Sequence, residues 1–229
     1  LSQEFLQASG KLGLQGTARE LEQAIPYLPI LEALRGLLAL PGWAEIRARL
    51  ALPAIWLAET ARLLPEVLPD VPREQGGSLI AVSPASSSPP SEEARLWEGL
   101  AQFMRAVAWQ RPVLLFLDDI HWADTSTLAL LGYLLRHTGA APVSFMLAAR
   151  AVLPQTPLGA LVASLTRENR MERIELGRLS AEAVRGLAEN LCSSGLQEFS
   201  DWLATTSEGN PYILAELVRH ARKMGIFED

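Results

Sequence analysis

Two adjacent carboxylates follow a run of apolar residues in the stretch "RPVLLFLDDIHWAD", residues 111–124. An unbroken apolar run is typical of a strand that is buried in a parallel sheet. Asp118 and Asp119 would therefore stand at the carboxyl end of such a strand. Ligands of open parallel sheets bind beyond this end of the strands, so chemistry is expected here.

The two acids have different expected roles. Side chains of a strand point to alternate faces, but the alternation ends with the strand, so that both carboxylates can reach one site. Asp118 can hold a hard cation such as Mg²⁺, and Asp119 can orient an attacking water. The structural alternative is that the acids cap the next helix or pair with arginines. We assign no metal role to the histidines, whose spacing is not that of metal ligands.

Strands and helices alternate through most of the sequence, which predicts an α/β fold with a parallel sheet. Further strands are expected at residues 143–149 and 171–176 and within "KLGLQGTARE". Helices are expected at residues 1–8, within "PYLPILEALRGLLALPG", and at 44–64, 91–110 and 125–137. The last fifty residues read as three helices without strands. We therefore predict an α/β domain at residues 1–177 and a small all-helical subdomain at 178–229.

Composition narrows the class of protein. The 229 residues are 49% hydrophobic and carry a net charge of -6, with Lys and Arg scattered along the chain. This pattern argues against a nucleic-acid surface.

No apolar stretch is long enough to span a membrane, and the first residues do not resemble a secretory leader. With a single cysteine, Cys192, the chain cannot form an internal disulfide, and we expect a cytoplasmic location.

The stretch "RPVLLFLDDIHWADTSTLALLGYLLRHTGAAPVSFMLAAR" resembles the Walker B and sensor segment of STAND-class P-loop ATPases, in particular the AAA-type ATPase domain of large LuxR-family bacterial regulators. Weaker similarities extend over most of the chain, in "ARELEQAIPYLPILEALRGLL", "RIELGRLSAEAV" and "TSEGNPYILAELVRH". The resemblance implies a P-loop NTPase-like core, with ATP and Mg²⁺ as the cofactors.

The resemblance also implies roles for individual residues. Asp118 would be the Mg²⁺-associated acid, Asp119 the residue that positions water, and Arg150 the sensor that reaches the γ-phosphate. Gly209 and Pro211 would lie near the nucleotide base. For the "GNP" segment the alternative is a plain turn between two helices, with the glycine in a left-handed cap.

The phosphate-binding loop that this family requires, G-x-x-x-x-G-K-[ST], does not occur in the sequence. The segment "SGKLGLQG" is a decoy: Phe5 stands where the first glycine belongs and Leu12 where the hydroxyl belongs. Lys11 is then an ordinary loop lysine. The chain begins with Leu1 rather than Met, and we expect it to be a fragment whose phosphate loop and central strand lie upstream.

The resemblance implies an ATP-binding and ATP-hydrolysing switch domain of a bacterial signalling or transcriptional regulator, inactive as this chain alone. The expected partners are a nucleotide and other domains of the parent chain, with self-association as a further option, and neither nucleic acid nor membrane. The alternative is a non-catalytic protein-interaction domain that retains the ATPase fold. A serine hydrolase is disfavoured because no G-x-S-x-G occurs.

Overall fold

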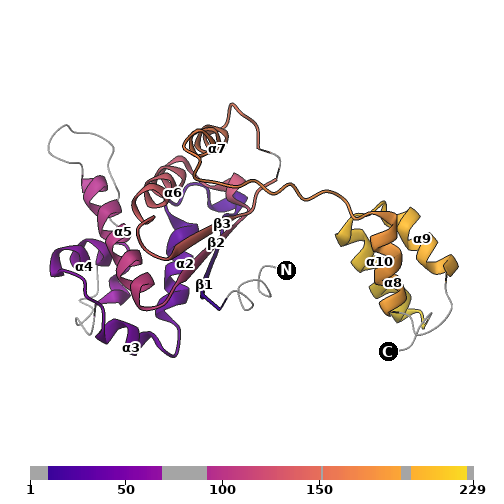
Figure 1. The fold of residues 1–229 in the computed structure, drawn as a ribbon, viewed down its shortest axis with the longest axis horizontal. Helices are drawn as coiled ribbons and strands as arrows, with labels where there is room; N and C mark the ends of the chain where they lie inside the picture. Colours follow the sequence, from indigo (N-terminus) through magenta and orange to yellow (C-terminus); the bar gives the residue numbers. More distant parts are fainter. Residues whose placement is uncertain (1–9, 69–91, 151, 192–196, 226–229) are drawn as a thin grey trace. The chain divides into compact units, whose positions relative to one another are not determined.

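The computed structural model describes residues 10–68, 92–150, 152–191 and 197–225 (Figure 1). The chain divides into two compact units, Leu1–Met171 and Glu172–Asp229. Each unit is considered by itself. The domain boundary expected at residue 177 stays a prediction.

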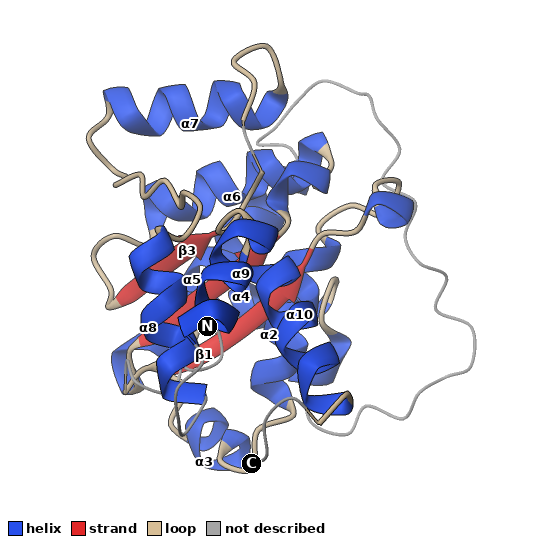
Figure 2. Cartoon of the chain, turned by 90° about the vertical axis from the view of Figure 1, so that its right-hand side faces the viewer, coloured by secondary structure: helices blue, strands red, loops and turns tan. Residues whose placement is uncertain are grey.

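The first unit is built on a three-stranded parallel sheet (Figure 2). Its strands are β1 (Leu12–Thr17), β2 (Val113–Asp118) and β3 (Val143–Leu147), in the order β1-β2-β3. Thr17 pairs with Asp118, and Leu117 pairs with Leu147. The central strand β2 is thus hydrogen-bonded on both sides, and the α/β fold with a parallel sheet is confirmed.

Three helices form the main layer against the sheet: α2 (Leu28–Leu38), α5 (Glu92–Gln110) and α6 (Thr125–His137). Their apolar faces share one core with the β2 residues Val113, Leu115 and Leu117. Helix α7 (Pro157–Arg167) packs on α6. Short 3-10 turns lie at Glu20–Glu22 (η1), Pro65–Val67 (η2) and Ile120–Trp122 (η3).

The helix expected at residues 44–64 is two helices, α3 (Trp43–Ala48) and α4 (Ala54–Ala61). Pro53 separates them, with an extended backbone at φ -55° and ψ 141°. A proline disfavours helical geometry in the residue before it, so the pattern could not continue through Leu52. The single-helix prediction was wrong for this reason.

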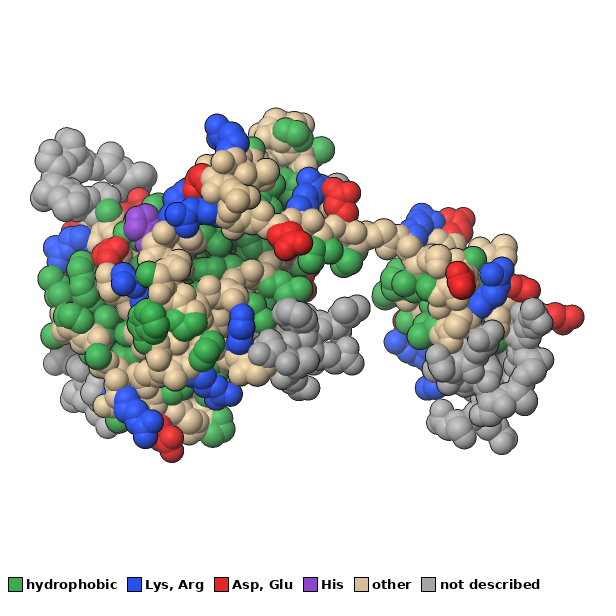
Figure 3. Space-filling model, in the orientation of Figure 1, with side chains coloured by type: hydrophobic (Ala, Val, Ile, Leu, Met, Phe, Trp, Pro, Cys, Tyr) green, Lys and Arg blue, Asp and Glu red, His purple; other side chains and the backbone are tan. Residues whose placement is uncertain are grey.

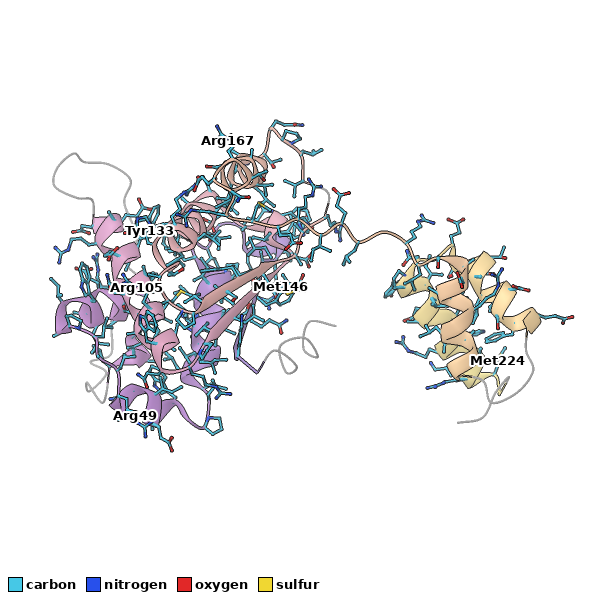
Figure 4. All side chains as sticks on the ribbon, viewed as in Figure 1. Arg49, Arg105, Tyr133, Met146, Arg167 and Met224 are labelled. Atoms are coloured by element: carbon cyan, nitrogen blue, oxygen red, sulfur yellow. The ribbon has the colours of Figure 1, made fainter. Side chains whose placement is uncertain are left out.

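The strand expected at residues 171–176 is absent: these residues are described and have no regular secondary structure. Ile174 is 77% exposed and Leu176 is 92% exposed. An extended segment becomes a strand only when a neighbour accepts and donates its backbone hydrogen bonds. In the described sheet β3 is an edge strand, paired with β2 alone, and Met146 on it is 37% exposed (Figure 4).

The second unit contains the three helices that the sequence predicts: α8 (Ala181–Leu191), α9 (Gln197–Ser207) and α10 (Pro211–Lys223). Val184, Ala188, Leu203 and Leu214 form its buried cluster. This core is small, and Leu187 and Ile213 remain 46% and 40% exposed.

The helix expected at residues 1–8 lies outside the described residues. On the face shown in Figure 3, Lys and Arg side chains are scattered among hydrophobic and acidic ones. In the described ranges, no helix combines the length and apolarity needed to cross a membrane.

Candidate functional site

The carboxyl edge of the sheet carries the two acids that the sequence singles out. Strand β2 ends at Asp118, which is half-buried, and the Asp119 side chain is 48% exposed. The Asp118 Oδ1 atom accepts a hydrogen bond from the backbone N–H of Asp119 at 2.9 Å. One oxygen of Asp118 therefore stabilises the turn at the strand end.

Asp119 has a left-handed backbone, with φ 50° and ψ 33°. This conformation is uncommon for residues other than glycine, and it often occurs at functional sites. It ends the strand abruptly, so the side chains no longer alternate between the two faces of the sheet at this point. The following turn is held to β3 by the Ile120 N–H, which donates to the Ala148 carbonyl at 3.0 Å.

Arg150 lies just beyond β3, at the same edge of the sheet, and is exposed. Its backbone N–H donates to Nδ1 of His121 at 3.5 Å, and the same nitrogen is 3.9 Å from Oδ1 of Asp119. In the described part of the chain, the Arg150 guanidinium makes no ion pair. The structure thus brings the Asp119 carboxylate and the Arg150 backbone to one histidine ring.

The carboxyl end of β1 adds charged groups next to the acids of β2. The Thr17 N–H donates to Oε2 of Glu32 at 2.9 Å, and Arg19 donates to Oε1 of Glu32 at 3.0 Å and to Glu22 at 2.9 Å. The hydrogen bonds of Arg19 to Glu22 and then to Glu32 raise the pKa of Arg19 above its ordinary value.

A small cavity of about 10 Å³ lies beside these residues, lined by Thr17, Arg19, Glu22, Trp122 and Asp124 among others. That volume holds about one water molecule. The cavity therefore does not have the size of a nucleotide pocket.

Asp124, the third acid of the opening stretch, is the N-cap of α6. Its Oδ1 accepts the Thr127 N–H at 2.9 Å. The Thr127 hydroxyl in turn accepts the N–H of Tyr27, a buried residue with φ 65°, at 2.8 Å. Asp124 thus has the capping role that was the structural alternative for the acids.

Gly209 and Pro211 belong to the helical unit. Gly209 has φ 73°, and a Cβ atom there would lie 2.1 Å from the Leu179 carbonyl oxygen. Asn210 caps α10 by accepting the Tyr212 N–H at 3.0 Å, and Pro211 is the first residue of that helix. The segment therefore is a helix-to-helix turn with a left-handed glycine, and its role near a nucleotide base stays a prediction.

In the ranges that the structure describes, no group of three or more His, Cys, Asp and Glu side chains can hold a metal ion. Mg²⁺ in nucleotide sites is usually held by one or two carboxylates together with phosphates and waters. Asp118, half-buried with one oxygen engaged by a backbone N–H, fits a single ligand of this kind.

Thr17 and Arg19 were missed by the sequence interpretation. The signal was available: a short strand was expected within residues 11–20, and a parallel strand next to β2 would end at the same edge. Applying the strand-end argument to the first strand would have selected both residues. Lys11, interpreted as a loop lysine, precedes β1 and donates to the Ser144 hydroxyl at 2.7 Å.

In a comparison with known families, the family model of the AAA ATPase domain matches residues 1–148. This range is more than half of the chain, and it includes β1, β2, β3, Asp118 and Asp119. Arg150, Gly209 and Pro211 lie outside it. No curated protein matches the chain.

Proposed function

The chain belongs to the AAA ATPase domain family, and from this we propose that it is the Walker B and sensor part of an ATP-controlled switch of the STAND class. The observation that carries the proposal is the pair of acids at the carboxyl end of the central parallel strand. Family membership gives nucleotide binding as the general activity. The switch function and the regulator type are the proposed refinements.

The proposed roles follow from the chemistry of each group. Asp118 would hold Mg²⁺, which when bound neutralises phosphate charge, and the more exposed Asp119 would orient a water for attack on the γ-phosphate. Arg150, which lies just beyond the end of β3, would contact the γ-phosphate as a bidentate donor. Gly209 and Pro211 would lie near the nucleotide base.

A nucleotide site of this kind also needs a loop whose backbone N–H groups hold the phosphates. The 229 residues contain no G-x-x-x-x-G-K-[ST] sequence. We therefore expect the chain alone to bind ATP weakly or not at all, and to show no turnover. Calorimetry with Mg·ATP tests this expectation, and micromolar binding by these residues alone would contradict it.

The division of labour between the acids is tested in a protein that joins this chain to a phosphate-binding loop. Asp119→Asn should abolish hydrolysis while ATP binding is largely retained, because it changes the water-orienting group. Asp118→Ala should also weaken Mg²⁺-dependent binding. Equal loss of binding in both variants would show that the two roles are assigned wrongly.

A second candidate function is a non-catalytic interaction domain that keeps the fold. Phosphate-loop residues in the parent chain, present or absent, would separate the two candidates. The two candidates differ in one measurement: if the same joined protein, with an intact loop, binds no Mg·ATP, the interaction domain is the better assignment. A role in bacterial transcriptional control belongs to the first proposal and follows from the resemblance alone. A cytoplasmic location also belongs to it and rests on the single cysteine, Cys192.

A further inference from the structure

His121 lies between the two turns that carry Asp119 and Arg150. It belongs to η3, directly after the left-handed Asp119. Its Nδ1 is 3.5 Å from the backbone nitrogen of Arg150 and 3.9 Å from Oδ1 of Asp119. One ring nitrogen thus faces a group from the end of β2 and a group from the end of β3.

The ring is held in this orientation by packing. The His121 side chain is only 17% exposed, and its ring lies against Trp122 with the ring centroids 4.9 Å apart and the planes at 41°. A side chain that is confined in this way can act as a fixed spacer between two loops.

The hydrogen bond determines the tautomer of the ring. A backbone N–H can only donate, so Nδ1 must accept, and in the neutral ring the proton is then on Nε2. Nε2 is buried and has no hydrogen-bond partner among the described residues. A buried N–H without a partner costs free energy, which an apolar ring would avoid. Packing against Trp122 alone therefore does not account for a histidine at this position.

We propose that His121 is a positioning residue that accepts the Arg150 N–H through Nδ1 and so sets the turn carrying Arg150 against Asp119. The distance of 3.5 Å is long for such a bond, and the burial of the ring and its packing against Trp122 keep the two groups facing each other. The importance of this contact for ATP chemistry rests on the proposed function. The contact itself is independent of that function, because it is argued from the hydrogen bond and the packing alone.

The tautomer is the first test, and His137 provides a control within the same chain. The His137 Nδ1 is 2.8 Å from the Tyr133 carbonyl oxygen, which can only accept, so this ring must carry its proton on Nδ1. Long-range ¹⁵N NMR of the 229-residue chain, in mildly alkaline solution where free imidazole is neutral, should therefore find opposite tautomers for the two residues. A proton on Nδ1 of His121, facing Asp119, would overturn the proposal.

Two substitutions of similar size test which ring nitrogen matters. The side-chain oxygen of Asn can occupy the place of Nδ1, whereas Gln extends toward the place of Nε2. His121→Asn should keep the hydrogen-exchange protection of the Arg150 amide. His121→Gln should lower it about fivefold, the ratio that corresponds to one net hydrogen bond.

The Ile120 amide, bonded to the Ala148 carbonyl at 3.0 Å, is the internal control and should keep its protection in both variants. Equal loss of Arg150 protection in both variants, with the Ile120 amide still protected, would reject the Nδ1 contact. Both measurements are made without nucleotide. Their failure is therefore distinguishable from a failure of the ATPase proposal, and the tautomer is read on the unaltered chain even if a variant does not fold.

Discussion

Strand β2 and the segment 171–176 were both expected to be strands, yet only β2 is one. In β2, Leu115 and Leu117 are completely buried, and the strand has hydrogen-bonded neighbours on both sides. In the segment "MERIEL", Ile174 and Leu176 are 77% and 92% exposed. The difference shows that apolar residues in an extended pattern form a strand only under two conditions. A neighbouring strand must pair with their backbone, and a covering layer must bury their side chains.

Contacts within the segment 171–176 do not replace a neighbouring strand and a covering layer. Arg173 and Glu175 of the segment form an ion pair of 2.8 Å, with side chains 59% and 75% exposed. An exposed pair of this kind contributes little to stability. The segment therefore has side-chain contacts without a hydrogen-bonded ladder, whereas β2 has both a ladder and a core.

The largest expected difference between the two regions comes from shortening one leucine in each. Leu117→Ala removes a side chain that is completely buried in the core, and should lower the free energy of unfolding of the sheet unit by about 2–5 kcal/mol. Leu176→Ala should change it by less than about 0.5 kcal/mol. Denaturant titration of both variants checks the pair. A large cost at Leu176 would show that the segment packs against something in solution.

A pair of glycines makes a second comparison. A Cβ atom at Gly16 in β1 would lie 1.8 Å from the Pro29 carbonyl oxygen, while a Cβ at Gly177 would meet nothing within 4 Å. Gly16→Ala must displace backbone, so we expect a loss near the upper end of the usual range for overpacking, about 1–3 kcal/mol. Gly177→Ala should be close to neutral. Thermal unfolding of both variants measures the two losses of stability. Equal losses would contradict the close approach of α2 to β1.

A third comparison sets a contact between distant parts of the chain against the local ion pair. Thr127→Val keeps the shape but leaves the buried N–H of Tyr27 without its acceptor, which should cost about 1–3 kcal/mol. Thr127→Ser keeps the hydroxyl and should lose much less. Glu175→Gln, which breaks the exposed ion pair with Arg173, should cost less stability than either Thr127 substitution. Chemical denaturation of the three variants checks this order.

The smallest expected effect is a dependence on pH at Glu168, shortly before the segment. Hydrogen bonds from Arg136 and then from Ser164 lower the pKa of Glu168 to about 2, from an ordinary 4.5. A carboxyl with a lowered folded-state pKa stabilises the fold above its unfolded value and loses that contribution as the pH falls from 4.5 to 2.

Glu168→Gln should therefore make the loss of stability in that window slightly less steep, and leave the profile above pH 4.5 parallel to that of the unaltered chain. Because the group is exposed, solvent screens its contacts, and the change should be small. Unfolding curves at several acidic pH values measure it. An unchanged slope would mean that Glu168 is not held by Arg136 in solution.

Several elements were predictable because their signals are local. The bounds of β2 and α6 match the prediction at both ends, since Pro112 precedes the apolar run and Asp124 caps the helix by its own side chain. The strand expected at residues 143–149 ends two residues earlier, at Leu147. The Ala148 N–H still donates to Leu117, but the Ala148 carbonyl accepts from Ile120, beyond the left-handed Asp119, so the regular ladder stops there. The break at Pro53 also had a local signal, which the helical periodicity of residues 44–64 obscured.

The candidate site shows the same division. The sequence alone determined that Asp118 and Asp119 follow a buried strand, because an apolar run and its terminal acids can be read without knowing the neighbours. Only the tertiary structure decided that His121 faces both Asp119 and Arg150, and that residues 171–176 are not a strand. Both results depend on which backbone groups lie opposite one another in the folded chain. Partners that are far apart in sequence leave no periodic pattern in either segment, so neither result could be predicted from the sequence.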